Sequence, residues 1–218
     1  MTSVFIVGGN GKASPYSTMF ERQGWTVASS IKDADLVQFI GGEDVSPTMY
    51  SQGFHPKTTT NRRRDILETA VYQACARHAI PMAGICRGAQ LINVLQGGSL
   101  WQHVNNHVNW QGHAVFDEME NFSFKAPSLH HQMMRPGKDA FILCSAKQST
   151  TREGALKDGT PTEWKQARPF QDDVEACVYF SPAPMLCFQP HPEKAYSNGA
   201  EDIYFYYLKE YIGVEKGQ

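Results

Sequence analysis

The sequence predicts an α/β protein with a doubly wound, mostly parallel central sheet, helices on both faces and a small additional β region. Short apolar runs at residues 4–7, 36–40 and 81–85 alternate with helix-like segments at 15–23 and 64–78, and the links between them are short. Such alternation produces a parallel sheet that helices cover on both sides. The chain has 218 residues, of which 41% are hydrophobic and 19% charged, so it can bury an ample core.

The first strand, at residues 4–7, is expected to stop at the glycine-rich turn 8–11. A glycine-rich turn after a strand can cradle a phosphate. Neither GxGxxG nor a Gly-Lys-Ser/Thr sequence follows, so no nucleotide site is predicted. The helix over residues 15–23 is expected to end at Gly24. Strands are expected at 25–28 and 36–40, and the second of these ends at Gly41-Gly42.

A longer helix is expected over residues 64–78, because its apolar residues recur at helical spacing. The apolar stripe consists of Ile66, Leu67, Ala70, Val71, Ala74 and Cys75. The charged residues Arg64, Asp65 and Glu68 are interpreted as an ordinary charged face at the start of this helix. The basic run at 62–64 is interpreted in the same way, as a solvated helix start.

The second half of the chain is less regular. Strands are expected near residues 114–116, 140–144, 174–180 and 185–188. The polar stretch 150–169 is interpreted as a long loop or hairpin excursion that could cover the site. A C-terminal helix is expected over 199–212, with its tyrosines in packing or interface positions. Neither a repeat nor a linker interrupts the chain, so residues 1–218 are expected to form one domain.

Charge and cysteine content exclude several classes of function. The formal net charge is -2, which gives no electrostatic footprint for nucleic acid or an anionic membrane. The five cysteines are odd in number and show no CxxC spacing, so neither disulfides nor a zinc site are predicted. No signal peptide is recognised, and no apolar run approaches the ~20 residues that span a bilayer. We therefore expect a cytoplasmic protein in a reducing compartment.

Cys86 is the candidate nucleophile. It follows the apolar run 81–85, lies between Gly84 and Gly88, and precedes a helix-like segment. This strand, turn and helix order is typical of a nucleophile elbow, in which small neighbours let the backbone pass closely. A helix N-terminus beneath the thiol favours the thiolate. The alternative interpretation is a buried structural cysteine.

A cysteine nucleophile needs a base and a residue that orients the base. His191 and Glu193 follow the apolar run 185–188, and residues i and i+2 of an extended segment point to one side. Alone, this pair would be interpreted as an exposed histidine beside an ordinary acid. Five further histidines could suggest a metal hydrolase, but no acidic residue has a matching spacing and HExxH is absent, so no metal is predicted. These histidines are His103, His107, His113, His130 and His131.

Together these motifs resemble a known family. Residues 84–90 (GICRGAQ) with 191–193 (HPE) resemble the signature of the class I glutamine amidotransferase-like superfamily. Further matches point to its γ-glutamyl hydrolase-like branch. They are residues 41–50 (GGEDVSPTMY), Arg64-Asp65 with Glu68, 93–94 with 97–102, and 128–132 (SLHHQ). The resemblance runs in the same order from about residue 39 to residue 193.

The resemblance implies the flavodoxin-like fold of class I glutamine amidotransferases and a triad of Cys86, His191 and Glu193. The cysteine would attack a glutamine or γ-glutamyl amide and form a γ-glutamyl thioester. Ammonia or an amine would leave, and water would then release glutamate. The oxyanion would be held by the backbone N–H groups of Arg87 and of Gly42 or its neighbour. Substrate contacts are implied for Gly41, Gln90, Ser128, Leu129 and His130, and no cofactor is implied.

Three functions remain open at this point. The first is a stand-alone γ-glutamyl hydrolase. The second is the glutaminase part of an amidotransferase with a separate synthase partner, and the third is a catalytically silent binding module. The intact triad argues against the third. Two departures concern the site: Pro190 stands where relatives usually carry an aromatic residue, and only about forty residues precede Gly41-Gly42. The second departure suggests a more open or a different substrate site.

Overall fold

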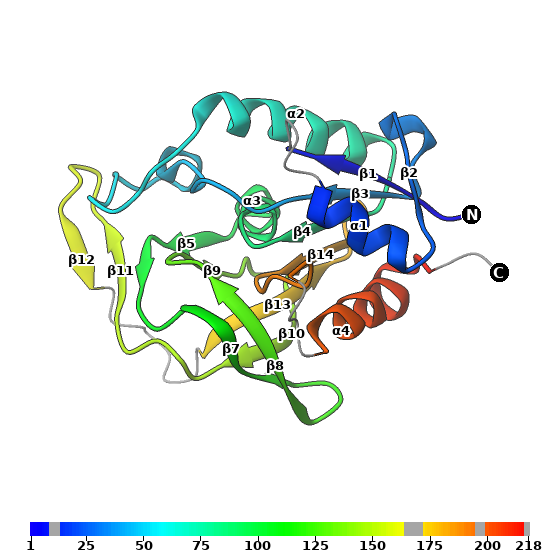
Figure 1. The fold of residues 1–218 in the computed structure, drawn as a ribbon. Coiled ribbons are helices and arrows are strands. Elements are labelled where there is room, and N and C mark those ends of the chain that lie inside the picture. Colours follow the sequence, from blue (N-terminus) through cyan, green and yellow to red (C-terminus); the bar gives the residue numbers. More distant parts are fainter. Residues whose placement is uncertain (9–13, 164–171, 195–198, 216–218) are drawn as a thin grey trace.

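The centre of the computed structural model is a nine-stranded sheet (Figure 1). The residues described are 1–8, 14–163, 172–194 and 199–215. The parallel part of the sheet consists, in spatial order, of β2 (Thr26–Val27), β1 (Ser3–Val7), β3 (Leu36–Phe39), β4 (Met82–Ile85) and β14 (Met185–Phe188). The antiparallel part continues with β13 (Asp173–Tyr179), β10 (Phe141–Ala146), β7 (Val108–Asp117) and β8 (Phe122–Leu129).

Helices cover both faces of this sheet, as predicted. On one face lie α1 (Ser14–Arg22) and α4 (Ala200–Tyr207), which continues as the π-helical turn η3 (Leu208–Ile212). On the other face lie α2 (Arg62–Arg77) and α3 (Arg87–Leu95). Figure 1 shows α2 and α4 on opposite sides of the strands. Short 3-10 turns, η1 (Ile31–Asp33) and η2 (Pro47–Tyr50), flank β3. None of the described helices is long and apolar enough to cross a membrane.

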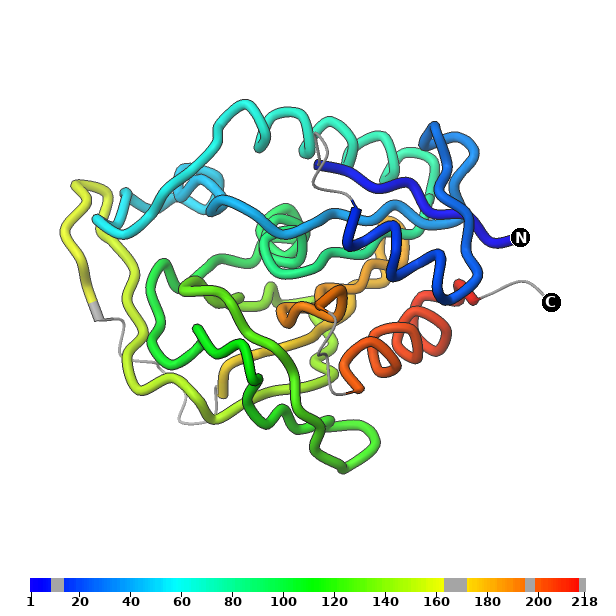
Figure 2. The backbone as a smooth tube through the Cα atoms, viewed as in Figure 1, coloured from blue at the N-terminus to red at the C-terminus, as the bar shows by residue number. Residues whose placement is uncertain are grey.

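The additional β region is larger than expected and partly belongs to the main sheet. The strand β8 was not predicted, because its sequence mixes polar residues, a lysine and a proline. Two small sheets add to it: β6 (His103–Val104) with β11 (Arg152–Ala155) and β12 (Pro161–Glu163), and β5 (Ser99–Trp101) with β9 (Met133–Arg135). Figure 2 shows the β11–β12 hairpin at the end of the molecule opposite α4.

The predicted excursion at residues 150–169 contains this hairpin, and residues 164–169 lie outside the described part. The hairpin packs against the segment after η2, because a Cβ at Gly53 would lie 1.9 Å from Leu156 O. His55 Nε2 is also 3.0 Å from Glu153 Oε2. Most of the predicted glycine-rich turn, residues 9–11, likewise lies outside the described residues.

The helix α2 differs from its prediction in the face that it buries. Ile66 and Leu67 were expected in the apolar stripe, yet they are 60% and 58% exposed. The buried positions are Asp65, Glu68, Tyr72 and Cys75. The prediction was wrong because a buried arginine of α3 binds the two carboxylates, and apolar periodicity does not detect such a pairing.

Candidate active site

Cys86 lies in a sharp turn between β4 and α3. Its φ of 52° and ψ of -111° are values that non-glycine residues rarely adopt. Its backbone N–H donates to Phe188 O at 2.9 Å. A Cβ at Gly84 would lie 2.3 Å from the carbonyl carbon of Gly88, and one at Gly88 would lie 2.4 Å from Phe39 O. The turn therefore requires both glycines, as a nucleophile elbow does.

His191 and Glu193 lie in the loop after β14. His191 Nδ1 is 2.8 Å from Glu193 Oε1, and the backbone N–H of His191 donates to Pro127 O at 3.1 Å. The other ring nitrogen, Nε2, has no hydrogen-bond partner among the described residues. Burial alone lowers the pKa of His191, but the negative charges of Cys86 and Glu193 raise it to about 10. With Pro190 beside it, the ring is still held by Glu193 and leaves Nε2 free to exchange a proton.

Gly41 brings the end of β3 to these residues. A Cβ at Gly41 would lie 3.0 Å from the Tyr16 hydroxyl, 3.3 Å from His191 Cε1 and 3.7 Å from Cys86 Cβ. Tyr16 of α1 was not predicted as a site residue, because its helix carries no motif. Its hydroxyl accepts a hydrogen bond from Gly41 N–H at 3.1 Å. Burial and the charge of Glu193 raise the pKa of Tyr16, which keeps this hydroxyl protonated.

The two predicted oxyanion donors are the backbone N–H groups of Gly42 and Arg87. Gly42 is exposed, has a φ of 148°, and its N–H makes no hydrogen bond within the part of the chain that the structure describes. Arg87 is the first residue of α3, where N–H groups have no acceptor within the helix. The two groups follow β3 and β4, which are neighbouring parallel strands.

Four side chains of α2 and α3 form a buried cluster, here called the arginine network: Arg64, Asp65, Glu68 and Arg87. Arg87 Nη2 donates to Asp65 Oδ1 at 2.6 Å, and Arg87 Nη1 donates to Glu68 Oε2. Arg64 Nε donates to Glu68 Oε1 at 2.7 Å. Asp65, Glu68 and Arg87 are at most 4% exposed. The prediction of a solvated charged face was wrong, because the arginine that binds these carboxylates is 19 to 22 residues away in the sequence.

Gln90, a predicted substrate-binding residue, lies one turn beyond Cys86 on α3. Its Nε2 donates to Gln132 O and to Gln189 Oε1, both at 3.1 Å. The side-chain amide thus makes internal hydrogen bonds. Leu129, at the end of β8, is half-buried. Contacts of both residues with a substrate remain predictions.

His130 belongs to a second buried cluster, here called the histidine network, and Ser128 adjoins it. The network consists of His107, His113, His130, Asp173 and Glu175. Ser128 Oγ donates to His107 O at 2.7 Å and is 3.0 Å from His130 Nε2. His107 Nε2 is 2.9 Å from Asp173 Oδ2. Burial, reinforced by His107, lowers the pKa of His130 well below 6.5. The predicted substrate segment therefore rests on a buried polar layer.

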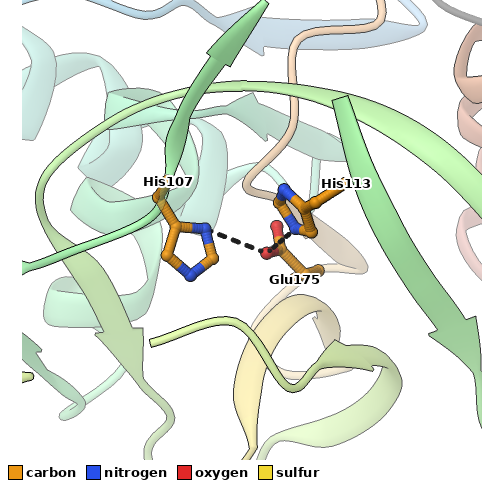
Figure 3. A group of neighbouring side chains, drawn as sticks. All are labelled: His107, His113 and Glu175. Carbon is orange, nitrogen blue, oxygen red and sulfur yellow. Dashed lines mark hydrogen bonds and ion pairs between the residues drawn. The ribbon is translucent and has the colours of Figure 1, made fainter. Parts of the chain in front are cut away.

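Figure 3 shows the centre of the histidine network, where His107 and His113 face Glu175 of β13. Two histidines and a carboxylate can bind zinc, and sequence spacing did not reveal this set because Glu175 is 62 residues from His113. His113 Nε2 is only 2.8 Å from Glu175 Oε1, which is the distance of a direct hydrogen bond. Burial alone lowers the pKa of His113, but Glu175 raises it above 6.5. The contacts are those of a hydrogen-bonded ion pair.

Residues 12–193 match the peptidase C26 family. A Mycobacterium tuberculosis relative named as a glutamine amidotransferase is 40% identical over 160 residues, which are 71% of this chain and 49% of the relative. The gamma-glutamyl-CDP-amidate hydrolase of Campylobacter jejuni is 32% identical over 111 residues, 50% of each protein. The chain spans half or less of the length of the curated relatives it matches.

Solved structures share the fold at low sequence identity. A Thermoplasma acidophilum protein named as part of a GMP synthase has a TM-score of 0.63 and 15% identity, with 98% of this chain and 93% of that chain covered. A glutamine amidotransferase of Thermotoga maritima has a TM-score of 0.61 and 13% identity, with 96% and 83% covered. These likenesses confirm the flavodoxin-like fold of class I glutamine amidotransferases. The match over residues 12–193 shows that the chain belongs to the peptidase C26 family.

Proposed function

We propose that the protein hydrolyses a γ-glutamyl amide bond through a γ-glutamyl thioester on Cys86. Cys86 Sγ attacks the γ-carbonyl carbon. The oxyanion then collapses to the thioester as ammonia or an amine leaves with a proton from His191. Water, deprotonated by His191, attacks the thioester and releases glutamate and the thiol. The observation that carries the proposal is the position of the His191 ring. Its Nδ1 is bound to Glu193, its Nε2 has no partner among the described residues, and a Cβ at Gly41 would lie 3.3 Å from its Cε1 and 3.7 Å from Cys86 Cβ.

The oxyanion hole in this proposal consists of the Gly42 and Arg87 N–H groups. One such donor is typically worth about 3 kcal/mol in the barrier. Gly42 is exposed, and its N–H makes no hydrogen bond within the described residues, which supports its role as a donor. The position of Arg87 at the start of α3 supports the role of the Arg87 N–H. The glutamyl part of the substrate would lie along Gly41, Gln90, Ser128, Leu129 and His130.

Glutamate release from free glutamine and from γ-glutamyl amines tests the proposal. The Cys86→Ala variant should lose turnover on every substrate that the wild-type protein cleaves. Cys75→Ala is the matched control, because Cys75 is also buried but lies on α2 with no part in the site, and it should remain active. Turnover retained in Cys86→Ala would contradict the mechanism.

A second candidate function is a glutaminase that passes ammonia to a separate synthase. It is favoured by the structural neighbour named as part of a GMP synthase. In that case glutamine alone should be cleaved slowly and γ-glutamyl amines not at all. Efficient cleavage of γ-glutamyl amines by the isolated chain would contradict this second candidate.

We further propose that residues 1–218 act as one domain in a reducing, cytoplasmic compartment. The sheet that runs from β2 to β8 supports the first part. All five cysteines are free thiols, and a thiol nucleophile must stay reduced to act, which supports the second.

A further inference from the structure

Arg64 connects the arginine network with the loop that follows β3. Its Nη2 donates to Ile40 O and to Gly41 O, both at 3.0 Å, and its Nη1 donates to Glu43 Oε2 at 3.0 Å. Its Nε donates to Glu68 Oε1 at 2.7 Å. The side chain is only 12% exposed. Two nitrogen atoms of the guanidinium, Nη1 and Nη2, thus hold this loop against α2, and the third, Nε, is bound to Glu68 of the same helix.

The hydrogen bond to Gly41 O also determines where the next N–H points. Gly41 O and Gly42 N–H belong to one peptide unit, which is not among the cis bonds of the described residues. In a planar trans unit the C=O and N–H point in opposite directions. The Gly42 N–H therefore points away from Arg64. Because both flanking residues are glycines, the unit can rotate at little steric cost, so the hydrogen bond is needed to set its orientation.

Glu68 links Arg64 to the second N–H group. Its Oε1 accepts from Arg64, and its Oε2 accepts from Arg87, whose own backbone N–H is the other proposed oxyanion donor. A single buried carboxylate thus connects the residues that present both donors. Stabilisation of an oxyanion depends on donors that are already in place before the charge develops.

We propose that Arg64 is a positioning residue, which holds the Gly41–Gly42 peptide with its N–H directed at the developing oxyanion. Glu68 fixes the spacing between this peptide and the Arg87 N–H. The inference rests on the proposed thioester mechanism and adds a residue that touches no reacting atom. When the hydrogen bond from Arg64 is lost, the peptide unit rotates and its carbonyl oxygen competes for the position of the N–H.

The test compares Arg64→Gln with Arg63→Gln, because Arg63 is the neighbouring exposed arginine of the same helix. In Arg64→Gln we expect kcat to fall roughly 100-fold, the loss typical of one oxyanion donor, with KM changed less than about threefold. Alkylation of Cys86 by iodoacetamide forms no tetrahedral oxyanion, so its rate should stay within about twofold of that of Arg63→Gln. Arg64→Lys should recover roughly tenfold of the lost kcat, because an ammonium is a point donor without the fork geometry.

A kcat of Arg64→Gln within about threefold of that of Arg63→Gln would overturn the inference. Equal losses of kcat and of the alkylation rate would also overturn it, because they would show a general disturbance of Cys86. Failure of the underlying mechanism is distinguishable, since it appears as turnover retained in Cys86→Ala with Arg64 intact.

Discussion

The arginine network and the histidine network are both buried, yet they respond differently to pH. A guanidinium stays charged wherever proteins fold, and Glu68 and Glu43 raise the pKa of Arg64 although burial alone lowers it. In the histidine network, the pKa of His113 is raised and that of His130 is lowered. The pKa values of the two imidazoles are therefore shifted in opposite directions, whereas the Arg64 guanidinium stays charged.

The difference teaches that burial by itself does not make a charge network sensitive to pH. The type of residue matters, because a guanidinium stays charged at any pH at which proteins fold, whereas the ordinary pKa of an imidazole, about 6.5, lies near neutrality. The arginine network adjoins the proposed oxyanion donors, because Arg64 binds Gly41 O and Arg87 is one of its members. The histidine network adjoins Ser128, which belongs to the proposed substrate segment.

The largest expected effect is the loss of stability in Glu68→Gln. Removing this carboxylate leaves Arg64 and Arg87 with too little buried negative charge, so the free energy of unfolding should fall by about 3–5 kcal/mol. Urea denaturation at pH 7 measures it. Glu43→Gln is the control, because Glu43 also binds Arg64 but its side chain is 40% exposed, and it should lose less than about 1 kcal/mol. Similar losses in both variants would contradict the buried role of Glu68.

The next effect is on catalysis in Gly42→Ala, whose kcat should fall about 100-fold. An added Cβ would lie 1.9 Å from Arg64 Nη1, and the φ of 148° disfavours alanine, so the peptide must move. Steady-state glutamate release measures the change. Gly97→Ala is matched for positive φ but has no atom within 4 Å, so its kcat should stay near the wild-type value. A fully active Gly42→Ala would show that the Gly42 N–H binds no oxyanion.

A smaller effect, and one that depends on pH, is expected in His113→Gln. The pKa of His113 is raised in the folded protein above 6.5, so the folded protein binds the proton more tightly than the unfolded chain. The stabilisation is complete below about pH 6.5 and is lost as pH rises through the folded pKa. The variant should be about 2 kcal/mol less stable than wild type at pH 6, the range of a hydrogen bond to a charged group.

Urea denaturation at pH 6, 7.5 and 9 tests this sign. The stability difference between the two proteins should shrink as pH rises. His191 also has a raised pKa, but it is present in both proteins, so its contribution cancels. A difference that stays constant or grows with pH would mean that His113 is bound as a neutral ring.

The smallest expected effect is on the pH profile of activity. Because Cys86 and Glu193 raise the pKa of His191 to about 10, kcat/KM should be nearly constant between pH 7 and 9 and fall by half near pH 10. The fall reflects loss of the proton that His191 gives to the leaving amine. The basic limb should be the same in His113→Gln and in Glu43→Gln. A limb that moves in either variant would show that its network takes part in the titration.

Local sequence signals predicted the strands of the parallel part of the sheet and the turn at Cys86. The bounds of β4 and β14 agree with the predicted strands to within one residue, because these are uninterrupted apolar runs. Signals of this kind could not predict the partners of buried charges. Arg87 and Glu175 meet residues 22 and 62 positions away, so their pairing depends on the topology of the sheet. Tyr16 was missed for the same reason, since it reaches Gly41 from another helix.

The backbone hydrogen bond from His191 N–H to Pro127 O has a consequence for how specificity could be changed. It joins the loop of the proposed base to β8, an edge strand of the nine-stranded sheet, which belongs to the β7–β8 hairpin. A protein engineer could exchange that hairpin between relatives as a cassette, provided that the junction at Pro127 keeps its register. An insertion of one residue before Pro127 would present the neighbouring peptide to His191 instead, because successive carbonyls of a strand alternate in direction. The hairpin is therefore a replaceable part with one fixed attachment point.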